Sequence, residues 1–344
     1  MPGDKNDSVE AAAVVVAEPQ EEQSSGTAHP IRYYAEIFPG HGVPLPDSFC
    51  AAVKEMEGIL DIPIWLLIQN GEGACSSLDG RVFKGFRKLK AQISEERPVG
   101  LLVDSSGGDA KFAYHIARLF QRRTSQLTVM VPQYAKSAAT LLALGASKLI
   151  LGRDSELGPL DVQIFDPERE DYDSALNAVQ SLERLNAFSL TAVDQAVRLF
   201  MARTGKKSDT LLPLVLEYVT NFVKPLLEKI DTVDYTKKSR DLKVAEQYAI
   251  RLMRPNFSRS NAERIAGHLV EKYSTHGFVI DPQEAEACEQ VGPTEWFGLG
   301  LTTIETPAEG IEEAMEKIAP FLDTITAIGR LREVHNHEKE EKSA

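Results

Sequence analysis

The sequence predicts an α/β protein with a mostly parallel sheet, flanking helices and a helical C-terminal half. Up to about residue 152, apolar runs of strand length alternate with segments of helical periodicity, and from about residue 174 helical periodicity continues alone. The content of 43% hydrophobic and 26% charged residues is typical of a globular protein. Alternating strands and helices favour a parallel sheet with right-handed crossovers.

Each element of the alternating part is expected from its own pattern. Continuous apolar runs of strand length predict buried strands, and apolar residues three or four positions apart predict helices packed on one face. In chain order these are the strand IPIWLLIQ (62–69), the helix GRVFKGFRKLKAQI (80–93), the strand PVGLLVD (98–104), the helix AKFAYHIARLFQRR (110–123), the strand LTVMVP (127–132), the helix SAATLLALGA (137–146) and the strand KLILG (148–152).

Composition shifts divide the chain into three parts. Residues 1–28 are rich in Ala, Glu, Gln and Ser, and we expect a disordered tail because they offer little apolar surface to bury. Residues 29–308 form the predicted main domain, with a helical extension from about 174 that caps the sheet or carries contacts between subunits. Residues 309–344 are expected to form a helix reaching about Val334, followed by a charged tail.

Charge and cysteine content exclude several function classes. A net charge of −13 disfavours a nucleic-acid partner. Three scattered cysteines predict neither a disulfide framework nor a CxxC metal site, and favour the reducing cytoplasm. The apolar run 11–17 is too short for a signal or membrane segment, so we expect no membrane anchor. The sequence contains no HExxH, EF-hand, GxGxxG or phosphate-loop motif, and we therefore expect no metal and no cofactor.

Two loops follow predicted strands at the edge of the sheet where ligands usually bind. In VDSSGGDA (103–110), the glycines Gly107 and Gly108 permit positive φ and close approach of a ligand to backbone N–H groups. In VPQYAKSAAT (131–140), Ser137 falls in the first turn of a predicted helix. It is either a helix N-cap or a nucleophile whose charge the helix N-terminus stabilises.

The segment 62–163 resembles the serine dehydrogenase proteinase family, a branch of the Clp/crotonase fold related to signal peptide peptidases. The motifs that carry the resemblance are VDSSGGDAKFAYHIARLF (103–120), VPQYAKSAATLLALGASKLIL (131–151) and LGPLDVQ (157–163), with weaker similarity at 272–292. The resemblance implies a Clp/crotonase-like fold, Ser137 as nucleophile, and Gly107, Gly108 and Ala138 as oxyanion donors. The chain departs from the family by KSAA (136–139) in place of Met-Ser-Gly-Gly and by SSGG (105–108) in place of Thr-Pro-Gly-Gly.

A serine nucleophile needs a general base, and the sequence leaves several candidates open. His276 has the most suitable intrinsic pKa and lies in the stretch of weaker resemblance. Asp161, 24 residues after the serine, could orient a base or cap a turn. Lys136 is adjacent to the serine, and Lys206 or Lys207 would supply a Ser-Lys pair of the kind that related peptidases use.

Three functions are compatible with these features. The first is a serine hydrolase that cleaves a peptide or protein substrate and assembles as a homo-oligomer, as the resemblance implies. The second is a catalytically inactive module for binding or assembly, which the KSAA turn would permit. The third is crotonase-like chemistry on an acyl-CoA, for which no adenine or phosphate contacts can be located in the sequence.

Overall fold

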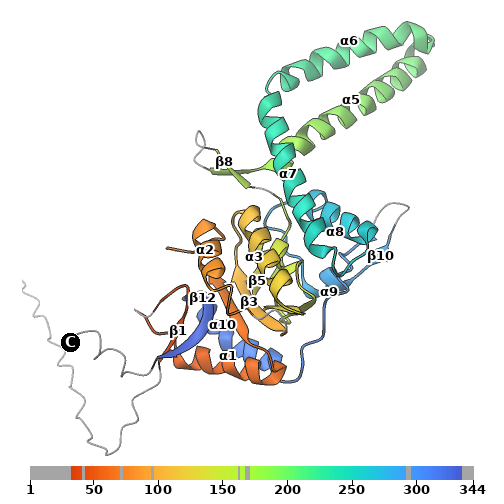
Figure 1. Cartoon of the computed structure of the whole chain (residues 1–344). Coiled ribbons are helices and arrows are strands. Elements are labelled where there is room, and N and C mark those ends of the chain that lie inside the picture. Colours follow the sequence, from red (N-terminus) through yellow and green to blue (C-terminus); the bar gives the residue numbers. More distant parts are fainter. Residues whose placement is uncertain are drawn as a thin grey trace, which may run out of the picture. The chain divides into compact units, whose positions relative to one another are not determined.

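The computed structural model describes residues 32–40, 43–69, 73–93, 97–161, 163–166, 171–291 and 296–334. Its main sheet has the strand order β1-β12-β2-β3-β4-β6, with β5 paired to both β3 and β7 (Figure 1). Neighbours from β2 to β6 are parallel, whereas β1 and β12 are antiparallel to their neighbours. The strands of this sheet are β1 (Arg32–Ala35), β2 (Ile64–Gln69), β3 (Val99–Ser105), β4 (Leu127–Val131), β5 (Tyr134–Ala135), β6 (Lys148–Leu151), β7 (Glu156–Leu157) and β12 (Thr326–Val334). The predicted mostly parallel sheet is confirmed.

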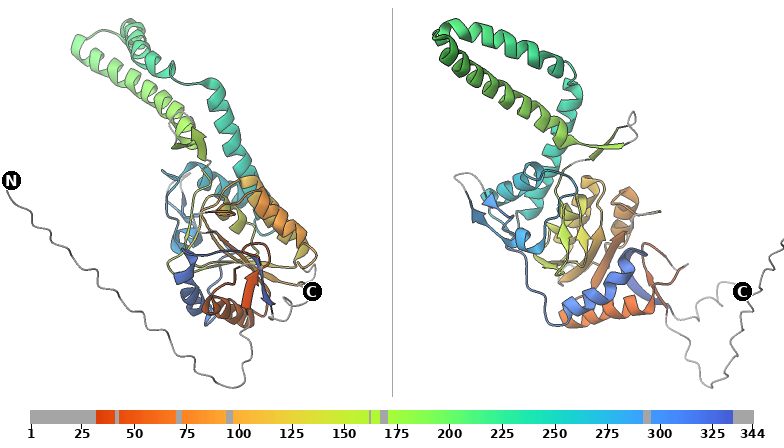
Figure 2. Two further views of the ribbon diagram at one scale, coloured as in Figure 1. Left: turned by 90° about the vertical axis from the view of Figure 1, so that its left-hand side faces the viewer. Right: turned by 180° about the vertical axis from the view of Figure 1, so that it is seen from behind.

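Helices cover both faces of this sheet, which is why its central strands are continuous apolar runs. Along β2, Ile64 and Leu66 pack with α1 (Asp47–Leu60) and α10 (Ile311–Leu322) in one core. The intervening Trp65 and Leu67 belong to a second core. That core is shared with α2 (Gly80–Lys88), α3 (Ala110–Arg123), α4 (Ala138–Ala143) and α8 (Arg259–Glu271). Both views in Figure 2 show α1 and α10 side by side on the same face of the sheet.

The helical C-terminal half is also confirmed. It comprises α5 (Ala175–Thr204), α6 (Ser208–Leu227), α7 (Thr232–Met253) and α8. The hydroxyl of Ser174 accepts the N–H of Asn177 and begins α5, and Gly205 at φ 65° ends it. α5 and α6 form an antiparallel pair (Figure 1), joined by a seam that includes Val215, Val219 and Val223. Among the described helices, none combines the length and the apolar character needed to cross a membrane.

The structure corrects the predicted C-terminal helix. The helix ends at Leu322, and residues 326–334 form β12, so the prediction of a helix reaching about Val334 is wrong. The stretch Thr324–Ile325–Thr326 is β-branched and favours a strand. Once extended, β12 pairs with β2, which is buried along its whole length and would otherwise be an unpaired sheet edge.

Several shorter elements were not expected from the sequence. α1 and β1 lie in the part of the main domain for which no element was predicted, and α2 ends at Lys88, five residues before the predicted end at 93. The others are β5, β7, β8 (Gln163–Asp166), β9 (Asp171–Ser174), α9 (Pro282–Glu286), β10 (Glu289–Gln290) and β11 (Trp296–Phe297). The predicted tail 1–28 and the charged end 335–344 lie outside the described residues.

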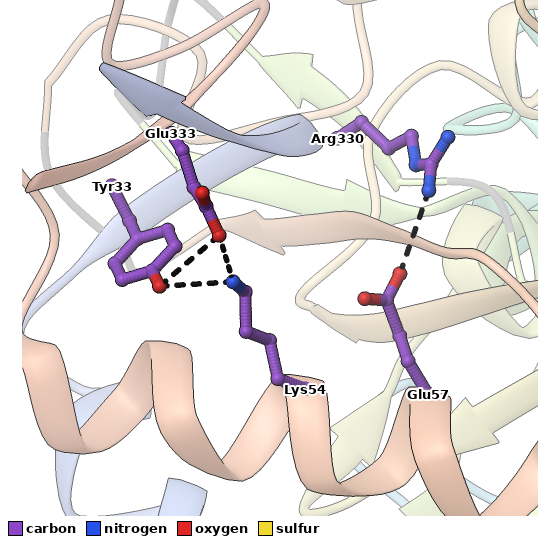
Figure 3. A network of polar contacts seen from close by, with 5 residues as sticks. All are labelled: Tyr33, Lys54, Glu57, Arg330 and Glu333. Atoms are coloured by element: carbon purple, nitrogen blue, oxygen red, sulfur yellow. Dashed lines mark hydrogen bonds and ion pairs between the residues drawn. The ribbon is translucent and has the colours of Figure 1, made fainter. Parts of the chain in front are cut away.

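A polar network links α1 to the antiparallel edge of the sheet (Figure 3). Lys54 on α1 donates to the Tyr33 hydroxyl at 2.9 Å and pairs with Glu333 of β12. Glu57, on the same helix, accepts the N–H of Ile64 at 2.8 Å and lies 3.9 Å from the Arg330 guanidinium. These contacts fix the helix on a sheet edge formed by the two ends of the domain.

Candidate active site

The turn before α4 holds Ser137 in an unusual backbone conformation. Its φ of 50° and ψ of −119° lie outside the regions that side-chain-bearing residues normally adopt, at a cost on the order of 1–3 kcal/mol. Ser137 occupies the N-cap position of α4, yet its hydroxyl makes no capping hydrogen bond. The capping alternative is therefore not realised, and the strain places a half-buried hydroxyl at the helix N-terminus.

The Gly107–Gly108 loop packs directly against this turn. A Cβ on Gly107 would lie 2.7 Å from the Lys136 carbonyl oxygen and 3.0 Å from the Ser137 Cβ. Both glycines have positive φ, 105° and 142°, which other residues rarely adopt. The two sequence-predicted loops therefore meet at the carboxyl ends of β3 and β5.

The N–H groups of this loop are not equivalent. Gly107 donates its N–H to the Ser105 hydroxyl at 3.1 Å, and its carbonyl accepts the N–H of Leu78 at 2.8 Å. Because a trans peptide places C=O and N–H on opposite sides, the N–H of Gly108 points away from Leu78. The N–H groups of Gly108 and Ala138 make no hydrogen bond to another described residue. Gly107, predicted as a donor, thus has its N–H engaged, whereas those of Gly108 and Ala138 are available.

A cleft of about 500 Å³ contains most of the predicted site. Ser137, Asp161 and His276 all line it, together with Gly108 and Ala138, whereas Gly107 is not among the lining residues. The remaining lining residues come from the two loops, from α3, α4 and α7, and from the segment after β7: Ser106, Asp109, Ala110, Lys111, Leu141, Leu160, Asp241, Val244, Ala245 and Tyr248. The structure therefore brings together residues separated by more than a hundred positions in the chain.

His276 reaches the cleft from the segment after α8. Reciprocal backbone hydrogen bonds of 2.9 and 3.1 Å between Leu157 and Ile280 attach this segment to β7. The imidazole is half-buried, and its Nδ1 is buried without a hydrogen-bond partner among the described residues. No hydrogen bond joins His276 to the Ser137 hydroxyl in the described part of the chain, although both residues line the cleft.

Asp161 is 3% exposed and accepts the N–H of Leu176 at 3.3 Å, in the first turn of α5. The turn-capping role that the sequence left open is thus present. The same carboxylate lines the cleft, and it connects the cleft wall to the start of the helical half.

The lysine candidates lie elsewhere. The Lys136 ammonium is 2.9 Å from Glu156 and also approaches the Leu157 carbonyl at 3.5 Å. The ammonium is thus engaged by Glu156 and the Leu157 carbonyl, and Lys136 is not among the residues that line the cleft. Lys206 and Lys207 are exposed in the connection between α5 and α6 and are absent from the cleft lining.

Sequence reasoning missed the contribution of α7 to the cleft. Asp241, Val244, Ala245 and Tyr248 lie on one side of this helix, and the Tyr248 ring stacks on Tyr114 of α3 at a centroid distance of 4.4 Å. Their spacing of three or four residues is a helical periodicity. That periodicity predicts a packed face but does not reveal which loops it faces.

A second missed residue is Asp104, the penultimate residue of β3. It is fully buried, and this burial raises the pKa of its carboxyl to about 7, opposed by the N–H groups of Tyr134 and Gln133 and assisted by the charge of Asp323. Its Oδ2 accepts the Tyr134 N–H at 3.3 Å, and its Oδ1 has no hydrogen-bond partner among the described residues. Asp104 thus connects β3, which leads to the glycines, with β5, which leads to Ser137.

Comparison with known proteins supports the resemblance seen in the motifs. Residues 53–207 match a family model described as ClpP-like SDH-type serine proteinase. An uncharacterized protein of Methanocaldococcus jannaschii, MJ0137, is 32% identical over 177 residues, which are 51% of this chain and 52% of that protein. A second protein of the same organism, MJ1495, is 34% identical over 70 residues, 20% of this chain and 24% of that protein. The chain therefore spans about half the length of the first curated relative and about a quarter of the second.

Two solved structures of ClpP1 from Listeria monocytogenes, one of them a point variant, also match. The variant is 16% identical, covers 46% of this chain and 81% of its own, and has a TM-score of 0.23. The other is 14% identical, covers 47% of this chain and 84% of its own, and has a TM-score of 0.24.

Proposed function

Because residues 53–207 match the ClpP-like SDH-type serine proteinases, we propose that this protein is a serine peptidase with Ser137 as its nucleophile. The observation that carries the proposal is the contact between the strained Ser137 turn and the Gly107–Gly108 loop at one cleft. A strained, uncapped serine at a helix N-terminus is a costly arrangement for a residue with a purely structural role.

The proposed reaction is acyl transfer. The Ser137 oxygen attacks the carbonyl carbon of a peptide bond, and the N–H groups of Gly108 and Ala138 bind the oxygen that becomes negative. Gly107 lacks a Cβ and so allows the loop to approach Ser137; its own N–H stays with Ser105. The C–N bond then breaks, and water hydrolyses the acyl-enzyme.

We assign proton transfer to His276 and orientation of the site to Asp161. The His276 imidazole, which lines the cleft with Ser137, accepts the hydroxyl proton and returns it to the leaving amine. Asp161 is the buried carboxylate on the same cleft wall. Lys136 is disfavoured as a base because Glu156 holds its ammonium.

Labelling with a fluorophosphonate probe tests this proposal. We expect mass spectrometry to find the phosphonyl group on Ser137 in the wild-type protein and to find none in Ser137→Ala. His276→Ala should slow labelling by about 100-fold or more, because a general base contributes roughly 10²–10⁴-fold. A folded wild-type protein that is not labelled would support the inactive binding module instead. Binding of an acyl-CoA in calorimetry would support crotonase-like chemistry.

We further propose a homo-oligomer assembled through α5 and α6. Their outer faces expose large apolar side chains: Phe188, Leu190, Leu199, Phe200, Met201, Leu212, Leu214, Leu216, Tyr218, Phe222, Leu226 and Leu227. A helix that is apolar on several sides is normally covered. A groove of about 380 Å³ runs along this surface, lined by residues including Leu190, Val193 and Leu216.

A second copy of this chain is the occupant that the charges favour. Residues 175–227 carry six basic and four acidic residues, a net charge of +2, whereas the whole chain carries −13. Two copies can therefore meet here with less repulsion than elsewhere on their surfaces. Two such hairpins would form a four-helix arrangement about a two-fold axis.

We also propose a cytoplasmic location. Cys50, Cys75 and Cys288 are all free thiols, as expected in a reducing compartment.

A further inference from the structure

Two buried polar side chains adjoin the glycine loop. Gln69 ends β2 and Ser105 ends β3, where the parallel register places them opposite each other, and both are 0% exposed. Gln69 Nε2 donates to the Cys75 carbonyl at 2.7 Å, and Gln69 Oε1 accepts the Ser105 hydroxyl at 2.8 Å. The Ser105 oxygen in turn accepts the N–H of Gly107 at 3.1 Å.

The donor and the acceptor of each hydrogen bond in this series are determined. The Cys75 carbonyl can only accept, so the amide nitrogen of Gln69 faces it and the amide oxygen faces Ser105. The Ser105 proton is therefore given to Gln69, and the Ser105 oxygen is left to accept the N–H of Gly107. No other orientation satisfies all of these buried groups.

Ser105 also holds the opposite loop. Its backbone carbonyl accepts the N–H of Lys136 at 3.0 Å, one residue before the nucleophile. Its side chain thus fixes the glycine loop while its main chain fixes the serine turn. We propose that Ser105 and Gln69 are positioning residues that hold Gly108 and Ala138 in register for an oxyanion, an inference that rests on the proposed peptidase function.

This arrangement orients the N–H of Gly108 through hydrogen bonds made by its neighbour Gly107. Gly107 is held at its N–H by Ser105 and at its carbonyl by Leu78, so the peptide plane between Gly107 and Gly108 cannot rotate freely. The orientation of this plane sets the direction of the Gly108 N–H. Loss of the Ser105 hydroxyl leaves the Gly107 N–H and the Gln69 Oε1 unpaired, so that only the Leu78 bond to the Gly107 carbonyl still holds the plane.

Amide hydrogen exchange tests the positioning role without requiring activity. In Ser105→Ala, we expect exchange in a peptide spanning residues 103–111 to accelerate by about tenfold, since one hydrogen bond to a buried amide is lost. Ser105→Thr keeps the hydroxyl and should restore the wild-type rate. The control is Ser155→Ala, because Ser155 is equally buried but its hydroxyl binds no other described residue. Wild-type exchange in Ser105→Ala would overturn the inference.

The labelling rate connects this positioning to catalysis. Ser105→Ala and Gln69→Leu should each slow fluorophosphonate labelling of Ser137 by about 100-fold, since small displacements of catalytic groups have effects of this size. Ser105→Thr and Ser155→Ala should label at the wild-type rate. If the wild type itself is not labelled, the peptidase proposal fails and exchange alone decides whether Ser105 orders the loop. Accelerated exchange with an unchanged labelling rate would contradict a role in positioning the donors.

Discussion

At the scale of the residue, Ser137 combines a strained backbone with a hydroxyl that makes no capping hydrogen bond to the helix it precedes. The positive φ of 50° is unfavourable for any residue with a Cβ, and the missing capping bond means that the side chain offers no compensation. A structural role would favour glycine at this position. The presence of serine in this conformation is therefore consistent with the proposed function, which needs the side-chain oxygen.

Replacing Ser137 by glycine should therefore stabilise the protein while removing the nucleophile. We expect Ser137→Gly to gain about 1 kcal/mol, or about 2 °C in Tm, because glycine adopts this conformation without strain. Ser137→Ala keeps the strain and loses no hydrogen bond, so its Tm should match the wild type. Thermal unfolding of the three proteins measures the difference, and a less stable Ser137→Gly would show that the turn is not strained.

Asp104 makes stability depend on pH in a defined window. A carboxyl has a pKa of about 3.9 in an unfolded chain. Burial raises that of folded Asp104 to about 7, so between these values the folded state binds more protons. Its stabilising contribution is complete below about pH 4 and decreases by at most about 1.4 kcal/mol per pH unit until the pH passes about 7.

Asp104→Asn should remove this dependence, since an amide has no proton to lose and can still accept the Tyr134 N–H. We expect the stability of the variant relative to wild type to rise from pH 4 to pH 7 and to stay constant above it. Urea unfolding at intervals across this range measures the difference. Curves that remain parallel over the whole range would show that Asp104 is ionised throughout.

At this scale, the sequence could predict which residues meet but not how each is bonded. Ser137 and Gly108 each follow a parallel strand, so their proximity follows from topology. That Gly107 gives its N–H to Ser105 could not be foreseen, because it depends on a glutamine 36 residues away whose orientation is set by a further carbonyl. The free nitrogen of His276 likewise depends on packing of distant segments.

At the scale of the element, one buried threonine joins the parts that surround the nucleophile. The Thr140 hydroxyl on α4 donates to the Ala135 carbonyl of β5 at 2.6 Å and accepts the Gly158 N–H at 3.0 Å. It is 0% exposed, so neither partner can turn to water if the hydroxyl is removed. The short helix and two short strands are held together by this group.

Thr140→Val preserves shape and removes both bonds, and it should destabilise the protein by about 2 kcal/mol. The matched control is Thr191→Val on α5, whose hydroxyl bonds to the Ala187 carbonyl at an exposed position and whose loss should change stability by less than about 0.5 kcal/mol. Equal effects of the two substitutions in urea unfolding would contradict the role assigned to Thr140.

Elements with a single dominant pattern were predictable, and those defined by pairing partners were not. The strands β2, β3, β4 and β6 are apolar runs that were predicted from the sequence, and α3 was predicted at its observed bounds. The segment that forms β12 was predicted as helix. It is a strand because it pairs with the otherwise open edge of β2, and this pairing cannot be read from local periodicity. β8 and β9 were missed for the same reason, since each is a strand because it pairs with the other.

At the scale of the whole molecule, the surface proposed for assembly on α5 and α6 is connected to the cleft at both ends of the hairpin. Asp161 of the cleft accepts the first-turn N–H of Leu176, and α7, which follows the hairpin, supplies one wall of the cleft. The apolar outer face of the hairpin is the proposed contact between copies. Contacts between copies at this face would therefore affect two walls of the cleft, one through Asp161 and one through α7.

Leu190→Glu places a charge in the apolar groove and should break the oligomer, because burying an unpaired carboxylate is costly. Light scattering on eluted protein should report a mass near that of one chain, compared with a multiple of it for the wild type. Val291→Glu, at a position 64% exposed and outside the hairpin, should leave the wild-type mass unchanged. A wild type that already elutes as a single chain would contradict the proposed assembly.

The most direct measurement is a crystal structure of the protein after reaction with a fluorophosphonate. We predict a covalent bond from the Ser137 oxygen to phosphorus, with the phosphonyl oxygen about 2.7–3.1 Å from the backbone nitrogens of both Gly108 and Ala138. An adduct on another side chain, or a phosphonyl oxygen directed away from these two amides, would contradict the proposal that the serine turn and the glycine loop form one catalytic site.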